Sequence, residues 1–251
     1  MQFLAAKEVH LVLNLLSEDS SRPTTLSRSL GDMTGFNLRH FAQHGKKVVA
    51  VGRNYRDHCA ELNNAVPTTP MLFMKPSSAY LTESSGPILI PRGCTDLHHE
   101  VELGVVIASE CRDVSVDTAM SHVGGYALAL DMTARDFQEK CKSKGQPWEI
   151  AKGFDTSLPV SRFITKEELP EPHNVVLWCK VNGEDRQRGN TREMVFNIPT
   201  LLSYISGIFT LQPGDLVLTG TPAGVGPVKA GDLISCGIAD LLQCQFAVAQ
   251  R

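Results

Sequence analysis

The sequence has few aromatic residues, almost no net charge and no long apolar segment. Aromatic side chains make up 6% of its 251 residues, and 24 basic residues stand against 27 acidic ones. A nucleic-acid partner usually requires clustered positive charge, so none is expected. Because a membrane helix needs about 20 consecutive apolar residues, and no stretch approaches that length, we predict a soluble globular protein without a membrane partner.

The sequence also lacks closely spaced cysteines. Its seven cysteines are odd in number and scattered, at positions 59, 94, 111, 141, 179, 236 and 244. None belongs to a Cys-x-x-Cys pair, which argues against a cysteine zinc site. Disulfide frameworks are typical of small secreted domains, whereas this chain is long enough to bury a substantial core. We therefore predict reduced thiols in a reducing compartment.

The N-terminal region differs in composition from the rest of the chain. Residues 17–30 are rich in Ser, Thr and Arg, which is typical of an unpacked segment. A mitochondrial presequence has such a composition, but the acidic residues around this stretch argue against one. Met33 is an alternative start of the chain. We predict an N-terminal extension over residues 1–45, either for targeting or poorly ordered, and a single domain over residues 46–251.

Short strands dominate the second of these regions. They are predicted from apolar and β-branched runs bounded by Pro and Gly. These runs lie at 48–51, 71–74, 88–90, 97–107, 124–130, 175–181, 215–219, 232–237 and 241–248. The dipeptide Asn182-Gly183 is a strong signal for a hairpin turn. The sequence therefore predicts an α+β protein that is rich in β-structure.

Helices are fewer and are predicted from their terminal signals. They are expected at 54–62, 113–120, 134–144 and 195–208. Asn54 is the predicted N-cap of the first helix. Thr133 and Asp136 resemble a capping box before the third, and Pro199 is expected to interrupt the last.

Two carboxylates interrupt the strand predicted over residues 97–107. Glu100 and Glu102 stand two residues apart, so in a strand they point to the same face, where like charges repel. Residues 103–107 are apolar on both faces, as in a buried strand, and a buried carboxylate normally pairs or becomes neutral. A solvent-facing edge would also explain the two acids. A divalent cation between them would remove the repulsion.

A third carboxylate, Asp131, lies at the carboxyl end of the strand predicted over 124–130. It could simply precede the next helix. Three carboxylates, however, suit Mg²⁺ or Mn²⁺ better than zinc, and they leave the other positions of an octahedral ion open to water and substrate. Arg135 and Gln138 share a face of that helix near Asp131. We therefore predict a catalytic metal site at Glu100, Glu102 and Asp131.

A histidine and two lysines are further candidates for the chemistry. His58 and Glu61 are neighbours on one helix face, so Glu61 could orient the imidazole while His58 takes a proton from water. A solvated or structural pair is the alternative. Lys75 and Lys152 each lie at the edge of an apolar segment. They could be surface lysines, cations for a substrate carboxylate, or partners of the metal carboxylates.

Two other features, a pair of adjacent histidines and a glycine-rich loop, match no standard ligand-binding motif. His98 and His99 adjoin the acidic residues and could bind zinc, but their spacing matches no standard zinc motif. The loop over 220–227 lacks the Lys-Ser/Thr of a phosphate-binding loop and follows no dinucleotide fingerprint. It is either a tight turn or a means of bringing backbone N–H groups and the Thr221 hydroxyl close to a small anionic ligand.

Taken together, these motifs resemble the fumarylacetoacetate hydrolase superfamily. The matching segments are 51–61, 75–76, 98–104, 129–136 and 218–222. They occur in consistent order over about residues 46–248, so the resemblance is far more specific than any one motif. It implies a β-roll of mixed sheets with short peripheral helices, and a homodimer.

The resemblance also implies roles for individual residues. Its acidic triad falls on Glu100, Glu102 and Asp131, which would hold Mg²⁺ or Mn²⁺. Its His/Glu dyad, on a helix that orders over bound ligand, falls on His58 and Glu61, and Lys152 matches a lysine near the metal. Residues implied to contact substrate are Arg53, Lys75, Arg135, Gln138 and Thr221.

The function implied is metal-dependent chemistry on small 2-oxo acids in mitochondria, with the cytosol as the alternative location. We expect hydrolysis of the C–C bond of acylpyruvates such as acetylpyruvate, with water activated by His58 and Glu61. We also expect decarboxylation of oxaloacetate, and both reactions would pass through a metal-stabilised pyruvate enolate. The alternatives are a 2-oxo acid isomerase or tautomerase of the same superfamily and a non-catalytic ligand-binding member.

Overall fold

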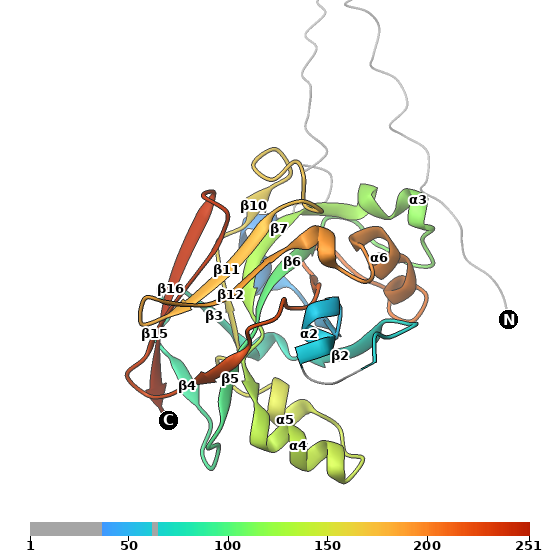
Figure 1. Ribbon diagram of the computed structural model, residues 1–251. Coiled ribbons are helices and arrows are strands. Elements are labelled where there is room, and N and C mark those ends of the chain that lie inside the picture. Colours follow the sequence, from blue (N-terminus) through green and yellow to red (C-terminus); the bar gives the residue numbers. More distant parts are fainter. Residues whose placement is uncertain (1–36, 62–64) are drawn as a thin grey trace, which may run out of the picture.

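A computed structural model describes residues 37–61 and 65–251 of the chain (Figure 1). Most of its regular structure is β-strand, arranged in mixed sheets with short helices around them. The prediction of a β-rich α+β protein is therefore confirmed. In the described ranges, no helix has the length and apolar character to cross a membrane.

The largest sheet contains eight strands, most of them from the N-terminal two thirds of the chain. In spatial order its strands are β2 (Met71–Lys75), β1 (Val48–Gly52), β13 (Leu216–Leu218), β6 (Val101–Ile107), β7 (Val123–Leu130), β9 (Leu158–Val160) and β3 (Tyr80–Thr82), with β10 (Ile164–Thr165) paired to β7. Two neighbouring pairs, β1 with β13 and β3 with β9, are parallel, and the other pairs are antiparallel.

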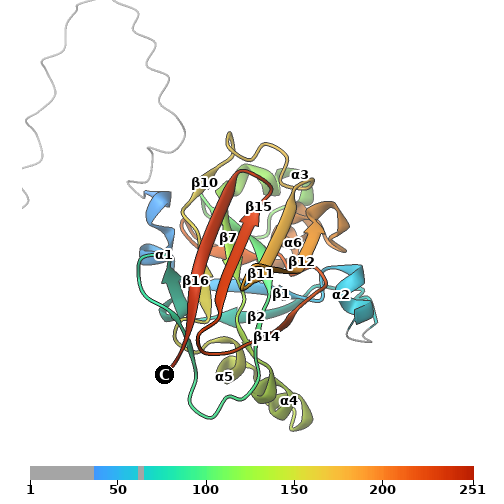
Figure 2. The same ribbon diagram turned by 60° about the vertical axis from the view of Figure 1, so that its left-hand side comes forward.

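The five-stranded sheet holds most of the C-terminal part. Its strands are β12 (Glu184–Asn190), β11 (Val176–Val181), β15 (Leu233–Ile238), β16 (Leu242–Gln250) and β4 (Ile88–Ile90). Figure 2 shows β11, β15 and β16 side by side. Asn182 and Gly183 both have positive φ, at 52° and 85°, and join β11 to β12. The predicted hairpin is thus confirmed, because both central positions of its turn require a residue that tolerates the left-handed region.

A third sheet of three short strands completes the fold. Its strands are β14 (Gly226–Val228), β5 (Leu97–His99) and β8 (Thr133–Ala134). The strand predicted over 97–107 is therefore two strands, because the chain leaves the small sheet after β5 and enters the large sheet with β6. Glu100 is the residue between them. The first acid of the predicted site thus lies at the junction of two sheets.

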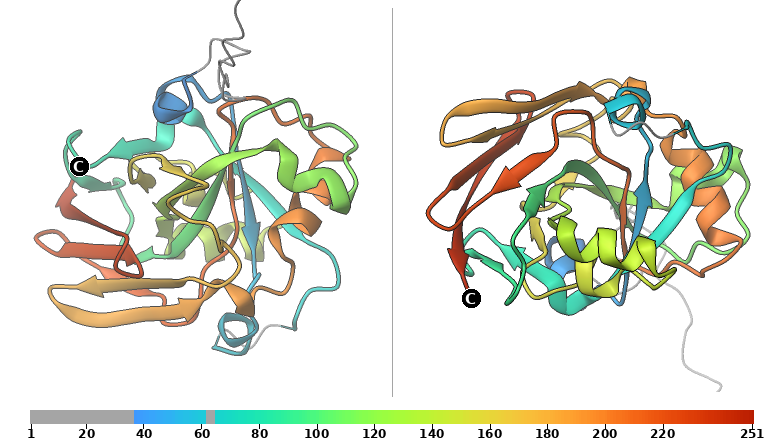
Figure 3. Two further views of the ribbon diagram at one scale, coloured as in Figure 1. Left: turned by 90° about the horizontal axis from the view of Figure 1, so that it is seen from above. Right: turned by 60° about the horizontal axis from the view of Figure 1, so that its bottom comes forward.

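The main core lies between the two larger sheets (Figure 3). Leu103 and Leu128, from β6 and β7, belong to the same buried cluster as Leu177 and Ile234 from the five-stranded sheet. On the other face of β6, Val106 belongs to a second cluster. Both faces of β6 are buried, which explains why residues 103–107 are apolar throughout.

The helices are short and peripheral. They are α1 (Phe41–His44), α2 (Arg56–Glu61), α3 (Val116–Ala119), α4 (Arg135–Ser143), α5 (Glu149–Lys152) and α6 (Ile198–Ser206), with 3₁₀ turns η2 (Leu38–His40), η3 (Ser77–Ala79), η4 (Met120–His122) and η5 (Thr191–Glu193). In Figure 1, α4 and α5 lie together below the sheets, and α3 and α6 lie together at the right.

The capping box predicted at Thr133 and Asp136 and the helix interruption predicted at Pro199 are both wrong. Thr133 does not cap α4, because its hydroxyl donates to the Asp131 carbonyl and the cap position is Ala134. Asp136 instead accepts from the backbone N–H of Thr95. Pro199 does not interrupt α6. It lies in the first turn, where a proline N–H is not needed, and Asn197 caps the helix.

Asn54 is not an N-cap either, but a buried bridge between three segments. Its side-chain amide donates to the carbonyl oxygens of Phe196 and Thr219, at 2.9 and 2.8 Å, and its oxygen accepts from the Phe196 N–H at 2.8 Å. The side chain is 0% exposed. Asn54 therefore fixes the start of the α2 segment to the end of β13.

The predicted extension over residues 1–45 lies mostly outside the described residues and stays a prediction, as does a start at Met33. Its last part is folded. Phe41 in α1 is buried and packs edge-on against the Tyr80 ring, with centroids 5.9 Å apart. Because Tyr80 belongs to β3, this ring contact packs α1 against the large sheet.

Replacing Asn54 tests the bridge. Asn54→Ala removes three hydrogen bonds and leaves buried backbone groups without partners, so the free energy of unfolding should fall by about 2–3 kcal/mol. Urea unfolding followed by circular dichroism measures it. Asn174→Ala, at an exposed position, is the matched control and should change the free energy by less than about 0.5 kcal/mol. Equal stability of the two variants would contradict the role of Asn54.

Candidate active site

Three carboxylates meet at one end of the β6–β7 ladder. Val101 pairs with Leu130, and the next residues outward, Glu100 and Asp131, are joined by a backbone hydrogen bond of 2.8 Å. Oxygen atoms of Glu100, Glu102 and Asp131 lie within 4.8 Å of one another, and all three side chains are buried. We call these residues the acid triad. The solvent-facing alternative for the two glutamates is therefore wrong.

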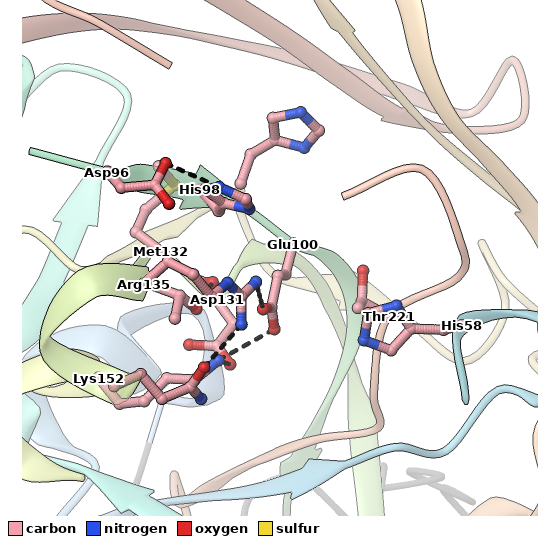
Figure 4. A network of polar contacts seen from close by, with 12 residues as sticks. His58, Asp96, His98, Glu100, Asp131, Met132, Arg135, Lys152 and Thr221 are labelled. Atoms are coloured by element: carbon pink, nitrogen blue, oxygen red, sulfur yellow. Dashed lines mark hydrogen bonds and ion pairs between the residues drawn. The ribbon is translucent and has the colours of Figure 1, made fainter. Parts of the chain in front are cut away.

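Two cations contact the acid triad from α4 and α5 (Figure 4). The Lys152 ammonium lies 3.0 Å from Glu100 Oε2 and 2.5 Å from Asp131 Oδ2. The Arg135 guanidinium lies 2.6 Å from Glu100 Oε1. Lys152 also lies over the Phe73 ring, 4.8 Å from its centroid. The sequence brings these groups together because α4 begins directly after β8 and α5 ends close to the same sheet edge.

Lys75 lies behind the acid triad. Its ammonium is 2.7 Å from Asp131 Oδ1 and donates to the carbonyl oxygens of Lys152 and Ser157. The residue is 1% exposed and does not line the cavity in front of the triad. Of the roles that the sequence leaves open, a partner of the metal carboxylates fits this position, and a direct contact with substrate does not.

The charges of the triad are unevenly balanced. Burial would raise the pKa of Glu100, but Lys152 and Arg135 outweigh burial and hold that pKa well below its usual range. Burial, and then the neighbouring charges of Asp131 and Glu100, raise the pKa of Glu102 well above its usual value. Glu102 is therefore the acid whose charge the protein neutralises least. A divalent cation would do so, and three carboxylates are the donor set that Mg²⁺ and Mn²⁺ prefer.

His58 and Glu61 form a pair at the same cavity. His58 is 5% exposed, and its Nδ1 lies 3.2 Å from Glu61 Oε2. Because a carboxylate only accepts, Nδ1 carries the proton and Nε2 is free to act on a ligand. Glu61 Oε1 also accepts from the Gly224 N–H at 3.0 Å. The helix of His58 is thus connected to the loop after β13.

That loop supplies donors to the site. The Gly220 N–H donates to Glu102 Oε2 at 2.6 Å. The Thr221 hydroxyl lines the cavity, but it donates to the Val101 carbonyl and accepts from Gln187, both at 2.8 Å. The backbone N–H groups of the loop therefore bind protein carboxylates, and a direct contact between Thr221 and substrate stays a prediction.

The remaining predicted contacts line the cavity. Arg135 Nη1 donates to Gln138 Oε1 at 2.8 Å, which leaves the amide NH₂ of Gln138 for a ligand. Arg53 also lines the cavity and has a positive φ of 59°, a conformation that is uncommon away from glycine and is often found at functional sites. The cavity lining also has an apolar part, which was not predicted. It includes Phe73 and Trp148.

The two adjacent histidines do not join the acid triad. His98 Nε2 bonds Asp96 at 2.9 Å, and His99 Nδ1 bonds Gln187 at 2.9 Å. Within residues 37–61 and 65–251, the acid triad is the one group of three metal-ligating side chains. The zinc alternative is therefore wrong for the described part of the chain.

Sequence analysis missed Gln187, a buried residue with side-chain bonds to His99, Val101, Thr221 and Pro222. Its strand, β12, is otherwise mostly exposed and highly polar. The available signal was weak. Gln187 is the one uncharged side chain in Glu184–Arg188.

The fold and this site define a class of protein. The sequence model of the fumarylacetoacetate (FAA) hydrolase C-terminal family matches residues 47–249. The chain belongs to this family of enzymes, and the predicted superfamily and fold are confirmed.

Three relatives are closely similar. The mitochondrial oxaloacetate tautomerase FAHD1 of Bos taurus is 55% identical over 84% of this chain and 95% of its own. The mitochondrial oxaloacetate decarboxylase of Dictyostelium discoideum is 52% identical over 85% of this chain and 99% of its own. The crystal structure of fumarylpyruvate hydrolase from Pseudomonas aeruginosa, in complex with Mn²⁺ and pyruvate, is 36% identical. It covers 82% of this chain and 91% of its own, with a TM-score of 0.78.

Replacing Asp131 tests the acid triad. Asp131→Asn keeps the size of the side chain but removes a charged ligand, so Mn²⁺ affinity should fall at least about 100-fold, since even partners of metal ligands commonly contribute 10- to 100-fold. Isothermal titration calorimetry with Mn²⁺ measures it. Asp185→Asn, at an exposed ion pair with Lys180, should bind Mn²⁺ like the unmodified protein. Unchanged affinity of Asp131→Asn would show that the triad is not the site.

Proposed function

We propose that this chain acts on oxaloacetate, interconverting its keto and enol forms and decarboxylating it to pyruvate. The observation that carries the proposal is that the acid triad and His58 line one cavity, with Glu61 bonded to the Nδ1 atom of His58. Both reactions need the same two functions. A cationic centre stabilises charge on the 2-oxo oxygen, and a base or acid handles a proton at C3. The names of the two curated relatives support oxaloacetate as substrate.

Glu100, Glu102 and Asp131 would hold the divalent cation. When bound, the cation supplies positive charge that stabilises the negative charge developing on the substrate's 2-oxo oxygen. Lys152 and Arg135 orient the carboxylates of Glu100 and Asp131 through their ion pairs. The NH₂ group of Gln138 is placed to donate to a substrate carboxylate, since its oxygen is occupied by Arg135.

His58 is the proposed base at C3 of the substrate. Its Nε2 removes a C3 proton, and the electron pair of the C3–H bond forms the C2–C3 double bond. The carbonyl electron pair moves to the 2-oxo oxygen, which takes up a proton from water to give the enol, and His58 releases the C3 proton to water. Glu61 stabilises the imidazolium that forms on His58, because its carboxylate faces Nδ1.

Decarboxylation uses the same electron movement. The C3–C4 bond breaks, its electron pair forms the C2–C3 double bond, and CO₂ leaves. His58 Nε2, which has taken up a proton from water, then donates it to C3 while the electron pair on the 2-oxo oxygen re-forms the carbonyl, which yields pyruvate. No water attack is required, so the geometry of the cavity supports both oxaloacetate reactions with one set of residues.

Hydrolysis of acylpyruvates is the second candidate. The same pair could activate water for attack on a distal carbonyl, and the apolar part of the cavity lining, which includes Phe73 and Trp148, would accept an acyl group. The Pseudomonas relative, a fumarylpyruvate hydrolase, supports this candidate at 36% identity. The more similar relatives favour oxaloacetate. A homodimer and the choice between Mg²⁺ and Mn²⁺ remain predictions.

A paired substrate assay tests the proposed function. With Mn²⁺ or Mg²⁺, the purified chain should accelerate loss of enol absorbance and release pyruvate from oxaloacetate, and EDTA should abolish both until metal is restored. His58→Ala should reduce turnover about 10²–10⁴-fold without changing Mn²⁺ affinity.

His122→Ala is the control, because this histidine does not line the cavity. Turnover of acetylpyruvate alone would favour the second candidate. If neither substrate reacts, the proposed function is wrong, and the non-catalytic alternative gains support.

We also propose that the protein is mitochondrial, as the two curated relatives are by name. The full chain, synthesised in vitro, should enter isolated mitochondria and become resistant to added protease when the membrane potential is intact. Protein that stays accessible to protease under these conditions would favour the cytosol.

A further inference from the structure

Gln187 is a buried amide on an otherwise mostly exposed strand. It lies in β12 opposite Cys179 and is 1% exposed. Each polar atom of its side chain has partners. Oε1 accepts from His99 Nδ1 at 2.9 Å and from the Val101 N–H at 3.0 Å. Because a backbone N–H can only donate, these contacts fix the orientation of the amide.

The NH₂ group of Gln187 faces the loop after β13. It donates to Thr221 Oγ1 and to the Pro222 carbonyl, both at 2.8 Å. Thr221 in turn donates to the Val101 carbonyl at 2.8 Å. Gln187, Thr221 and Val101 therefore form a closed ring of hydrogen bonds that holds both polar groups of Val101.

Val101 is the residue between two members of the acid triad. On one side the β6–β7 ladder holds its backbone, but pairing with β13 covers only Gly104 to Val106 and does not hold Val101. The ring does so from the side of β12. The directions of both carboxylates consequently depend on Gln187.

Gln187 also holds the loop after β13, through its hydrogen bonds to Thr221 and Pro222. Two of the loop's N–H groups donate to carboxylates of the site, Gly220 to Glu102 at 2.6 Å and Gly224 to Glu61 at 3.0 Å. Thr221 and Pro222, which Gln187 binds, lie between these two glycines. The same amide thus sets the position of donors to the triad and to the partner of His58.

From this arrangement we propose that Gln187 is a positioning residue that couples the acid triad to the His58–Glu61 pair. It contacts neither the metal ligands nor His58 directly. It acts through Val101 on one side and through residues 220–224 on the other. Its effect on metal affinity is independent of the substrate, and only its effect on turnover rests on the proposed function.

The test is the variant Gln187→Met, which keeps the length of the side chain and removes all four hydrogen bonds. Calorimetry with Mn²⁺ alone should show an affinity about 10- to 100-fold weaker, as for other groups that orient metal ligands. At saturating Mn²⁺, kcat for oxaloacetate should also fall at least about tenfold, since the loop also positions Glu61.

Two controls separate positioning from general destabilisation. Gln243→Met makes the same change at an exposed position of β16 and should leave affinity and kcat unchanged. Ser206→Ala removes a buried hydroxyl of α6 that accepts from the Val114 N–H at 3.0 Å, away from the cavity. It should lower stability in urea but leave Mn²⁺ affinity within about twofold, since distant sites act independently.

Thr221→Val breaks the ring from its other side and completes a double-mutant cycle. Because both residues act through Val101, their effects should not add. The Mn²⁺ affinity of the double variant should lie within about twofold of the affinity of the single variant that binds Mn²⁺ less tightly. If Gln187→Met does not fold, Thr221→Val decides alone, and it should also weaken Mn²⁺ binding.

Several results would overturn the coupling role. These are unchanged Mn²⁺ affinity in the ring variants, the same loss in Ser206→Ala, additive losses in the cycle, or full kcat at saturating Mn²⁺. If the unmodified protein binds Mn²⁺ but does not turn over oxaloacetate, the proposed function fails instead. The affinity measurements then still decide whether Gln187 positions the triad.

Discussion

The site depends on one constraint, the placement of three carboxylates within 4.8 Å of one another in the interior. Like charges at such distances can coexist only with compensating positive charge. Lys75, Lys152 and Arg135 supply part of it through ion pairs with Glu100 and Asp131. None of these ion pairs involves Glu102, whose pKa is raised, first by burial and then by the charges of Asp131 and Glu100. The proposed divalent cation would complete the balance, and its charge would be available to a 2-oxo acid substrate.

The segments around the triad hold the three carboxylates close together. The acids lie where β6 and β7 end and the chain passes between sheets, so their backbone is held by side chains as well as by the ladder. Gln187 and the loop after β13 provide that support. The same loop bonds Glu61, so the part of the molecule that holds the carboxylates also orients the partner of His58. The proposed metal binding and the proposed proton transfer would therefore depend on the same network of hydrogen bonds.

The sequence predicted the apolar strands that lie between Gly and Pro, but it missed the short strands β3, β8, β9, β10 and β14. It predicted the triad because paired acids in a buried strand demand an explanation. Local cap signals failed at Asn54 and Thr133, whose side chains bond tertiary or turn partners instead. The break at Glu100 could not be predicted, because pairing with two different sheets leaves no local pattern. Gln187 was missed because its partners are distant in sequence and its strand is mostly exposed.

The most direct test of the account is a diffraction measurement on crystals grown with Mn²⁺, using anomalous scattering from manganese. The account predicts one strong anomalous peak bounded by carboxylate oxygens of Glu100, Glu102 and Asp131, beside the cavity lined by His58. Strong manganese peaks only elsewhere, with Glu100 and Asp131 still paired only to Lys75, Lys152 and Arg135, would contradict it.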